Sequence, residues 1–394
     1  MPSDTGEGSK KMKAATSWKA GILLAVVSSL AALTAAEVYF RFTSPYIIRK
    51  NTAGPVGVVV TEDNDSVLSG EYTFFMDTFR GRRLIPGSRV KRANYEGKKI
   101  EININSQGLR NEEIPAKKPD EKRLLFLGDS VTIGVDVPVE VTFPKQAERL
   151  LNPNGRDERI SCINGGIEGI GTKDEIDVFE DQWLSLRPDV VIVDFFLNDG
   201  NPPDRLAAGL ANPGFIRRHS VLAQTVFRAY KLRQLRHDKM EEAWMYEWMT
   251  IPPPPDWRTN RESFLKYASV AARDWGAAWE QGPWRGIEQQ MKRLQTLSEQ
   301  HGFKVVFVAF PVSFQVYADY LEDGPQRKLR ELAGKFNFRF FDMLPVFRSH
   351  AADGRIFIDA YHLTEYGHSL AGEAQAGFLS GNTQAADNHD KPTH

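Results

Sequence analysis

The chain has 394 residues, of which 41% are hydrophobic and 26% charged, and its formal net charge is −1 at pH 7. This length is enough for two domains, or for one domain with insertions, around a large core. The balanced charge gives no support for a nucleic-acid-binding protein. The single cysteine, Cys162, excludes an intrachain disulfide and a metal site built from several cysteines.

The N-terminal region contains an uncharged run, residues 20–36, that follows four lysines between positions 10 and 19. The run is short for a membrane-spanning helix, but residues 37–42 can extend it. The lysines predict that the N-terminus stays inside. We expect a disordered cytoplasmic tail over 1–18 and a transmembrane signal anchor over 19–40, which would make this a single-pass protein of the cell membrane. A cleaved signal peptide is the alternative, because "LTAAE" offers small residues for cleavage.

Residues 41–118 contain short β-branched segments such as "GPVGVVV" (54–60) and "KKIEININSQGLR" (98–110). These segments show partial alternation of polar and apolar residues and no strong helical period. The pattern predicts a β-rich lead-in that packs on the main domain.

From about residue 119 the chain alternates between predicted strands and helices. The strands are expected at 123–128, 159–164, 189–196, 304–310 and 338–341, and the helices at 142–152, 172–186, 285–302, 325–336 and 364–379. Thr142 is a candidate N-cap, and Thr172 with Glu175 has capping-box spacing. This alternation predicts an α/β domain over 119–380, with a doubly wound, mainly parallel five-stranded sheet.

Residues 200–284 interrupt the alternation and predict a helical insertion, and the polar tail 381–394 is expected to be disordered. Six of the eight tryptophans lie between Trp244 and Trp284. They could stack on sugar rings or cover an acyl chain, but packing of the insertion onto the core is the simpler interpretation. A basic run over 217–239 could meet an anionic surface, but a solvated helix face is the simpler interpretation.

Sites in doubly wound sheets lie beyond the carboxyl ends of the strands. Four polar or glycine-rich segments follow predicted strands: "GDS" (128–130), "NGGIEGIGT" (164–172), "LNDGNPP" (197–203) and "IDAYHLT" (358–364). We therefore expect these segments to meet at one edge of the sheet.

The residue types in these segments suit nucleophilic catalysis. A serine such as Ser130 is a weak nucleophile until a base removes its proton, and the usual base is a histidine held by a carboxylate. Asp359 and His362 have a spacing that lets the carboxylate hold one ring nitrogen while the other faces Ser130. Backbone N–H groups of the glycine-rich segment and the amide of Asn198 could form an oxyanion hole.

These motifs resemble those of the SGNH hydrolases, also called the GDSL esterase/lipase superfamily. Gly128-Asp129-Ser130 matches the first conserved block of that family, and Gly169 matches the second block. Asn198-Asp199 matches the last two residues of the third block, and Asp359-x-x-His362 matches the fifth block. The resemblance covers about 121–380 without the insertion, and it implies a flavodoxin-like SGNH fold. It departs from the family at Phe196, where the third block usually has glycine.

The resemblance also implies roles for individual residues. Ser130 would be the nucleophile, His362 the base and acid, and Asp359 the residue that orients His362. The oxyanion hole would consist of the N–H groups of Ser130 and Gly169 and the Asn198 amide.

The remaining residues of these segments are expected to have structural roles. Asp129 and Asp199 would brace the loops, His368 would be structural, and Gly165, Gly166 and Gly171 would serve turn geometry. No metal site and no cofactor are predicted.

The sequence thus predicts an exported, membrane-anchored serine esterase with its catalytic domain in the periplasm or outside the cell. Its substrate would be an O-acylated, above all acetylated, glycan or another envelope ester, with the membrane contacted through the N-terminal helix and no nucleic acid bound. The expectation of an envelope glycan comes from "NSQGLRNEE" (105–113), which resembles membrane-anchored members of the family. Two alternatives remain: an O-acyltransferase with the same triad, and a non-catalytic glycan-binding or assembly protein.

Overall fold

The structure is a computed structural model of the chain. It describes residues 7–43, 74–78, 81–153, 159–199, 220–223, 225, 226, 230, 248 and 251–381. The segment "GPVGVVV", most of the basic run 217–239, Trp244 and the tail beyond residue 381 lie outside the described residues.

A parallel sheet forms the centre of the molecule. Its strands are β5 (Glu121–Gly128), β6 (Arg159–Gly166), β7 (Val190–Phe195), β8 (Lys304–Ala309) and β9 (Arg339–Asp342). They pair in parallel in the order β6-β5-β7-β8-β9. This order corresponds to the flavodoxin-like arrangement and confirms the predicted doubly wound α/β fold.

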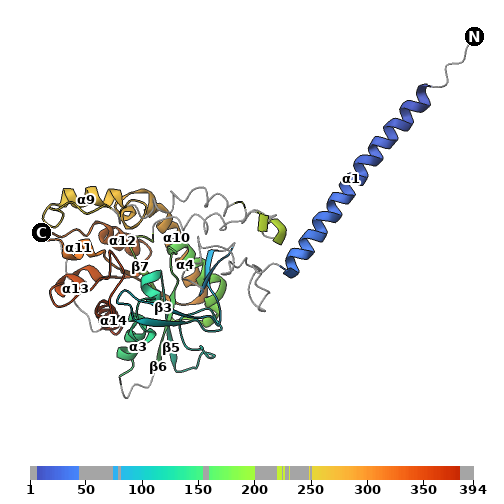
Figure 1. Cartoon of the computed structure of the whole chain (residues 1–394). Helices are drawn as coiled ribbons and strands as arrows, with labels where there is room; N and C mark the ends of the chain where they lie inside the picture. Colours follow the sequence, from blue (N-terminus) through green and yellow to red (C-terminus); the bar gives the residue numbers. More distant parts are fainter. Residues whose placement is uncertain are drawn as a thin grey trace, which may run out of the picture.

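Helices cover both faces of this sheet (Figure 1). On one face α14 packs against α3, which contacts β6, and on the other α10 packs against α4 and α12. The helices are α2 (Ser130–Ile133), α3 (Phe143–Leu151), α4 (Thr172–Val178), α9 (Arg261–Val270), α10 (Gly282–His301), α11 (Ser313–Tyr317), α12 (Gly324–Lys335), α13 (Met343–Ser349) and α14 (Glu365–Leu379). Short turns of other helix types are η1 (Val139–Val141), η2 (Phe179–Trp183), η3 (Leu184–Leu186) and η5 (Trp275–Trp279).

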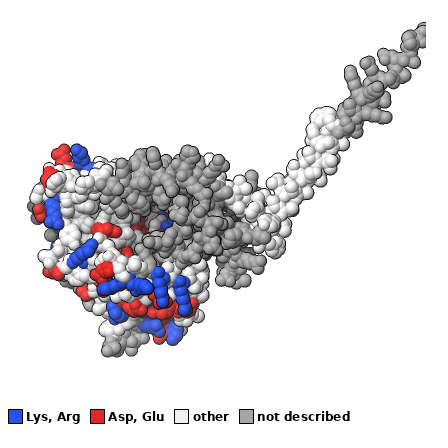
Figure 2. All heavy atoms as spheres, viewed as in Figure 1, with Lys and Arg blue, Asp and Glu red and all other residues white. Residues whose placement is uncertain are grey.

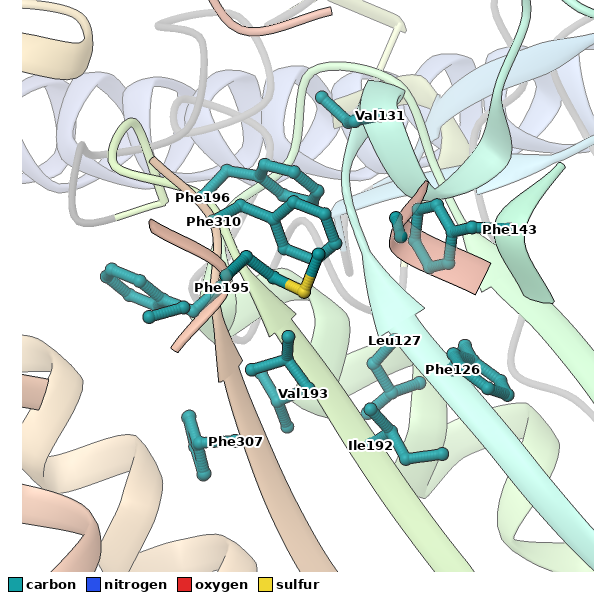
Figure 3. Packing of buried hydrophobic residues seen from close by; sticks show 14 of the residues in the cluster. Phe126, Leu127, Val131, Phe143, Ile192, Val193, Phe195, Phe196, Phe307 and Phe310 are labelled. Carbon is teal, nitrogen blue, oxygen red and sulfur yellow. The ribbon is translucent and has the colours of Figure 1, made fainter. Parts of the chain in front are cut away.

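The core lies between the sheet and these helices. Every side chain of β7 is buried, as expected for a central strand covered on both faces. Aromatic rings fill the region near the strand ends, where Phe196 stacks on Phe310 with ring centroids 4.5 Å apart (Figure 3). Phe196, which replaces the usual glycine, therefore points into the core and is 1% exposed. The departure from the family pattern is thus accommodated inside the protein.

Two antiparallel hairpins form the described part of the β-rich lead-in. They consist of β1 (Phe75–Thr78) with β2 (Gly81–Leu84) and β3 (Arg89–Ala93) with β4 (Lys99–Asn103). Beyond them, the buried guanidinium of Arg110 donates hydrogen bonds to the carbonyls of Ile133 (2.8 Å), Gly134 and Val137 (2.9 Å). The lead-in thereby holds the loop that follows α2.

The described part of the insertion packs on the domain through its aromatic residues. Trp248, Trp275 and Trp284 are buried. Trp275 stacks on Phe314 with centroids 5.3 Å apart. Gly276 sits so close to α9 that an added Cβ would lie 1.9 Å from the Ala268 carbonyl oxygen. For these three tryptophans, burial in the core agrees with the packing interpretation.

The N-terminal helix α1 (Glu7–Thr43) projects from the body in Figure 1. Residues Trp18–Phe42 are long and apolar enough to cross a membrane, a property that signal sequences share. These side chains are mostly exposed, and Figure 2 shows both positive and negative charges on the visible face of the body. Near its end, Glu37 accepts hydrogen bonds from the N–H groups of Val221 and Leu222, both at 2.9 Å.

Of the two predicted helix starts at threonines, one agrees with the structure and one does not. The capping box at Thr172 is wrong: Gly171 is the N-cap, so Thr172 already lies inside α4 and Glu175 is one position too late to reach back. Thr142 is the N-cap residue of α3, as predicted, but its hydroxyl donates to the Val139 carbonyl and makes no capping hydrogen bond.

Replacing Arg110 with methionine, which has similar size and no donors, should destabilise the fold. Three carbonyls would lose the hydrogen bond from Arg110, and a buried polar group left unsatisfied costs about 1–3 kcal/mol. We expect Arg110→Met to lower the melting temperature of the full chain by about 5–10 °C in a thermal unfolding experiment. Arg89→Met, at an exposed position of the same lead-in, is the control. An equal melting temperature for the two variants would contradict the role of Arg110.

Candidate active site

Ser130 lies at the point where β5 turns into α2. Asp129 caps this short helix, because its Oδ1 accepts the N–H of Val131 at 2.8 Å. Gly128 allows the tight turn, since an added Cβ would lie 2.1 Å from the Thr132 hydroxyl oxygen. The turn leaves Ser130 at the carboxyl end of β5, with 7% of its surface exposed.

His362 reaches Ser130 from the loop before α14. Its Nε2 lies 2.9 Å from Ser130 Oγ, and its Nδ1 lies 2.7 Å from Asp359 Oδ2. The other carboxylate oxygen of Asp359 accepts the N–H groups of Tyr361 and His362. A hydrogen bond from the Ile358 N–H to the His362 carbonyl closes the loop at 2.8 Å. The structure therefore brings the three predicted triad residues into one chain of hydrogen bonds.

The charges around His362 favour its protonated form. Burial lowers the pKa of His362, but the hydrogen bond and charge of Asp359, together with the charges of Asp129 and Asp136, raise it to about 9. Burial raises the pKa of Asp359, but its contacts with His362 outweigh this effect and the pKa is lowered. His362 thus has the basicity to take a proton, with Asp359 kept as the carboxylate.

The glycine-rich segment after β6 fits closely between α2 and the loop after β7. An added Cβ on Gly166 would lie 2.1 Å from the Ile133 nitrogen, and one on Gly171 would lie 2.6 Å from the Asp199 carbonyl oxygen. The Ile167 N–H donates to the Gly128 carbonyl at 3.0 Å. Gly169 has φ of 69°, a conformation that favours glycine. Close backbone packing therefore explains these glycines.

Asn198, in the loop after β7, is linked to the nucleophile turn. Its Nδ2 donates to Asp129 Oδ2 at 3.1 Å, which uses one of the two amide hydrogens. The loop is closed by Asp199, whose Oδ2 accepts the Phe196 N–H at 2.8 Å. Asp129 and Asp199 thus make the bracing contacts expected of them.

Several carboxyl groups are buried beneath the nucleophile turn. Burial raises the pKa of Glu175, Asp199 and Asp194, and the charge of Asp129 raises the pKa of each of them further. Within the described residues, no group of three or more His, Cys, Asp or Glu side chains is arranged to hold a metal ion.

His368 does not belong to the hydrogen-bond chain at Ser130. It is 2% exposed, stacks on Phe143, and accepts the Phe143 N–H on its Nδ1 at 3.3 Å. Burial, with the charges of Arg110 and His362, lowers the pKa of His368 to about 3. A neutral, packed histidine agrees with its predicted structural role.

Asp274, from the insertion, is a neighbour of the site that the sequence did not reveal. Its Oδ2 accepts the Trp248 Nε1–H at 2.8 Å and lies 3.5 Å from the hydroxyl of Tyr361, the residue before His362. Burial raises the pKa of Asp274 to about 7. The segment "RDWGAAW" contains no motif that distinguishes this aspartate from an ordinary one.

Comparison with known proteins gives a partial sequence match and several structural ones. No family model matches the chain. An arylesterase of Vibrio mimicus is 29% identical over 101 residues, which cover 25% of this chain and 50% of the arylesterase. The match thus spans half the length of that relative.

Among solved structures, an acetyl xylan esterase has 15% identity and a TM-score of 0.39, with 65% of this chain and 99% of that chain covered. A two-domain esterase active on acetylated mannans has 16% identity and a TM-score of 0.37, and the match covers 69% of this chain and 52% of that chain. A lipase/acylhydrolase from Enterococcus faecalis has 15% identity and a TM-score of 0.36, and the match covers 67% of this chain and 100% of that chain.

The four sequence blocks all lie at the same end of the parallel sheet. The "GDS" block ends the first strand of a sheet in flavodoxin-like order, and the other three blocks follow β6, β7 and the last strand of the same sheet. The strand order and these four blocks resemble those of the SGNH hydrolases, and the chain is similar to an arylesterase over part of its length.

Proposed function

We propose that the chain is a serine esterase in which Ser130 is the nucleophile, His362 the general base and acid, and Asp359 the residue that orients His362. The observation that carries the proposal is the continuous contact Ser130 Oγ–His362 Nε2 (2.9 Å) and His362 Nδ1–Asp359 Oδ2 (2.7 Å). This is the arrangement that converts a serine hydroxyl into a nucleophile.

The reaction has two steps. Ser130 Oγ attacks the ester carbonyl carbon while His362 Nε2 takes the hydroxyl proton, and the negative oxygen of the intermediate accepts hydrogen bonds from the N–H groups of Ser130 and Gly169 and from Asn198 Nδ2. The alcohol then leaves with the proton from His362. Water, deprotonated by His362, attacks the acyl-enzyme, and the acid and free Ser130 are released.

The proposed substrate is an acetylated glycan of the cell envelope. The nucleophile is recessed, with only 7% of Ser130 exposed, and buried Tyr361 lies beside the base. A recessed serine with aromatic neighbours suits a small acyl group better than a long chain. The apolar stretch Trp18–Phe42 supports the further proposal that the chain is anchored in the membrane with its catalytic domain in the periplasm or outside the cell.

The nucleophile can be tested with a serine-reactive fluorophosphonate and 4-nitrophenyl acetate. We expect Ser130→Ala, in the full chain in detergent, to lose labelling and to lower kcat by about 10³-fold or more. Ser349→Ala, at an exposed serine of α13, is the matched control and should retain both signals. Labelling that persists in Ser130→Ala would assign the nucleophile to another residue.

The pH dependence tests the role of Asp359. Because the base must be neutral, kcat/KM should rise with pH and level off above the His362 pKa of about 9. In Asp359→Asn the His362 imidazolium loses its carboxylate partner. The midpoint of the pH profile of kcat/KM should therefore fall towards the ordinary histidine value near 6.5, and kcat/KM itself should drop by about 10³-fold.

Asp136→Asn is the control for this profile, because the charge of Asp136 also raises the pKa of His362. We expect a smaller shift of the midpoint and little loss of rate. An unchanged midpoint in Asp359→Asn would contradict the proposed orienting role.

Product analysis separates hydrolysis from acyl transfer. With an acetylated oligosaccharide and an excess of unacetylated acceptor, we expect the acetate released to equal the ester consumed, as measured by mass spectrometry of the sugars and an acetate assay. Acetylated acceptor formed in proportion to its concentration, and absent with Ser130→Ala, would instead identify an acyltransferase.

A further inference from the structure

Arg82, in the β1–β2 hairpin of the lead-in, contacts the glycine-rich segment beside the nucleophile. Arg82 is 7% exposed, and its Nη1 donates to the Glu168 carbonyl oxygen at 3.0 Å. The guanidinium carbon lies 4.1 Å from the centroid of the Phe75 ring in the partner strand. These two contacts fix the direction of the Arg82 side chain.

The peptide group that Arg82 binds is the one that carries the Gly169 N–H. The Glu168–Gly169 bond is trans, so its carbonyl and its N–H point in opposite directions. Because Arg82 occupies the carbonyl side, the Gly169 N–H points away from Arg82. Within the described part of the chain, no carbonyl or side chain accepts this N–H. It is therefore available as a donor to a ligand.

The fit at this position is close. An added Cβ on Gly169 would lie 2.5 Å from Arg82 Nη1, and the φ of 69° already disfavours other residues. Gly169 thus serves two purposes: it adopts the left-handed conformation and leaves room for the guanidinium.

We propose that Arg82 is a positioning residue for the oxyanion hole, which acts by holding and polarising the Glu168–Gly169 peptide group. This inference rests on the proposed function, because it assigns a purpose to the Gly169 donor. A charged donor on the carbonyl draws electron density from the peptide group, which makes its N–H a stronger donor. It also fixes the N–H before the substrate arrives, and preorganised donors cost no reorganisation during the reaction.

The neighbouring Arg83 offers a matched comparison. It is also buried, and its Nη2 pairs with Asp181 Oδ2 at 3.1 Å. It anchors the same hairpin to η2. Loss of Arg83 should therefore weaken the docking of the hairpin without removing the hydrogen bond to Glu168.

The test compares Arg82→Met, Arg82→Lys and Arg83→Met in the full chain, with kinetic constants expressed per active site from end-point fluorophosphonate labelling. We expect Arg82→Met to lower kcat for 4-nitrophenyl acetate by about 10–100-fold with KM changed less than about twofold, because the oxyanion forms only in the transition state. Arg82→Lys should recover a large part of kcat, because an ammonium group can still donate to Glu168.

Arg83→Met should lower the melting temperature and leave kcat per active site unchanged. If the wild-type enzyme is active and Arg82→Met and Arg83→Met have equal kcat, the inference about Arg82 is overturned and the proposed function is not. Failure of Arg82→Lys to recover activity would also count against it, since a hydrogen bond to Glu168 would then not be the cause. A wild-type chain without turnover or labelling would overturn the proposed function and this inference with it.

Discussion

The contact between Ser130 and His362 joins residues that are 232 positions apart, and the geometry of the whole site depends on it. Each side of the contact is fixed separately. On one side, Gly128 and the Asp129 cap hold the turn from β5 into α2. On the other, Thr364 caps α14, and the paired residues Phe357 and Leu363 close the loop that carries His362. The sheet holds the Ser130 turn and the His362 loop at the same edge. Little conformational entropy is therefore lost when the two side chains form their hydrogen bond.

The electrostatic surroundings complement this geometry. The carboxylate of Asp359 and the charges of Asp129 and Asp136 surround His362, which supports the imidazolium that forms during each proton transfer. The same carboxyl groups disfavour negative charge on the substrate. Local N–H donors are therefore needed wherever an oxyanion develops, and the glycine-rich segment provides them in the proposed mechanism.

Much of the fold could be predicted from the sequence, because each strand of the sheet is an apolar run next to turn residues. The triad residues could be proposed as well, since their motifs follow predicted strands. Other features could not. Thr172 has capping-box spacing, but Gly171, which packs closely against Asp199, is the N-cap, so the helix starts one residue earlier than predicted. Arg82 and Asp274 act across the fold, and nothing in their local sequence separates them from exposed charged residues.

The two lead-in arginines have a consequence for where the catalytic unit begins. Arg82 holds the peptide group before Gly169, and Arg110 holds the carbonyls behind α2, yet both precede the first strand of the sheet. A fragment cut at residue 119 would keep the segments that carry Ser130, Gly169 and His362 and lose both supports. The smallest unit with an intact site therefore extends upstream to at least the β1–β2 hairpin, and truncations for expression or domain swaps should preserve it.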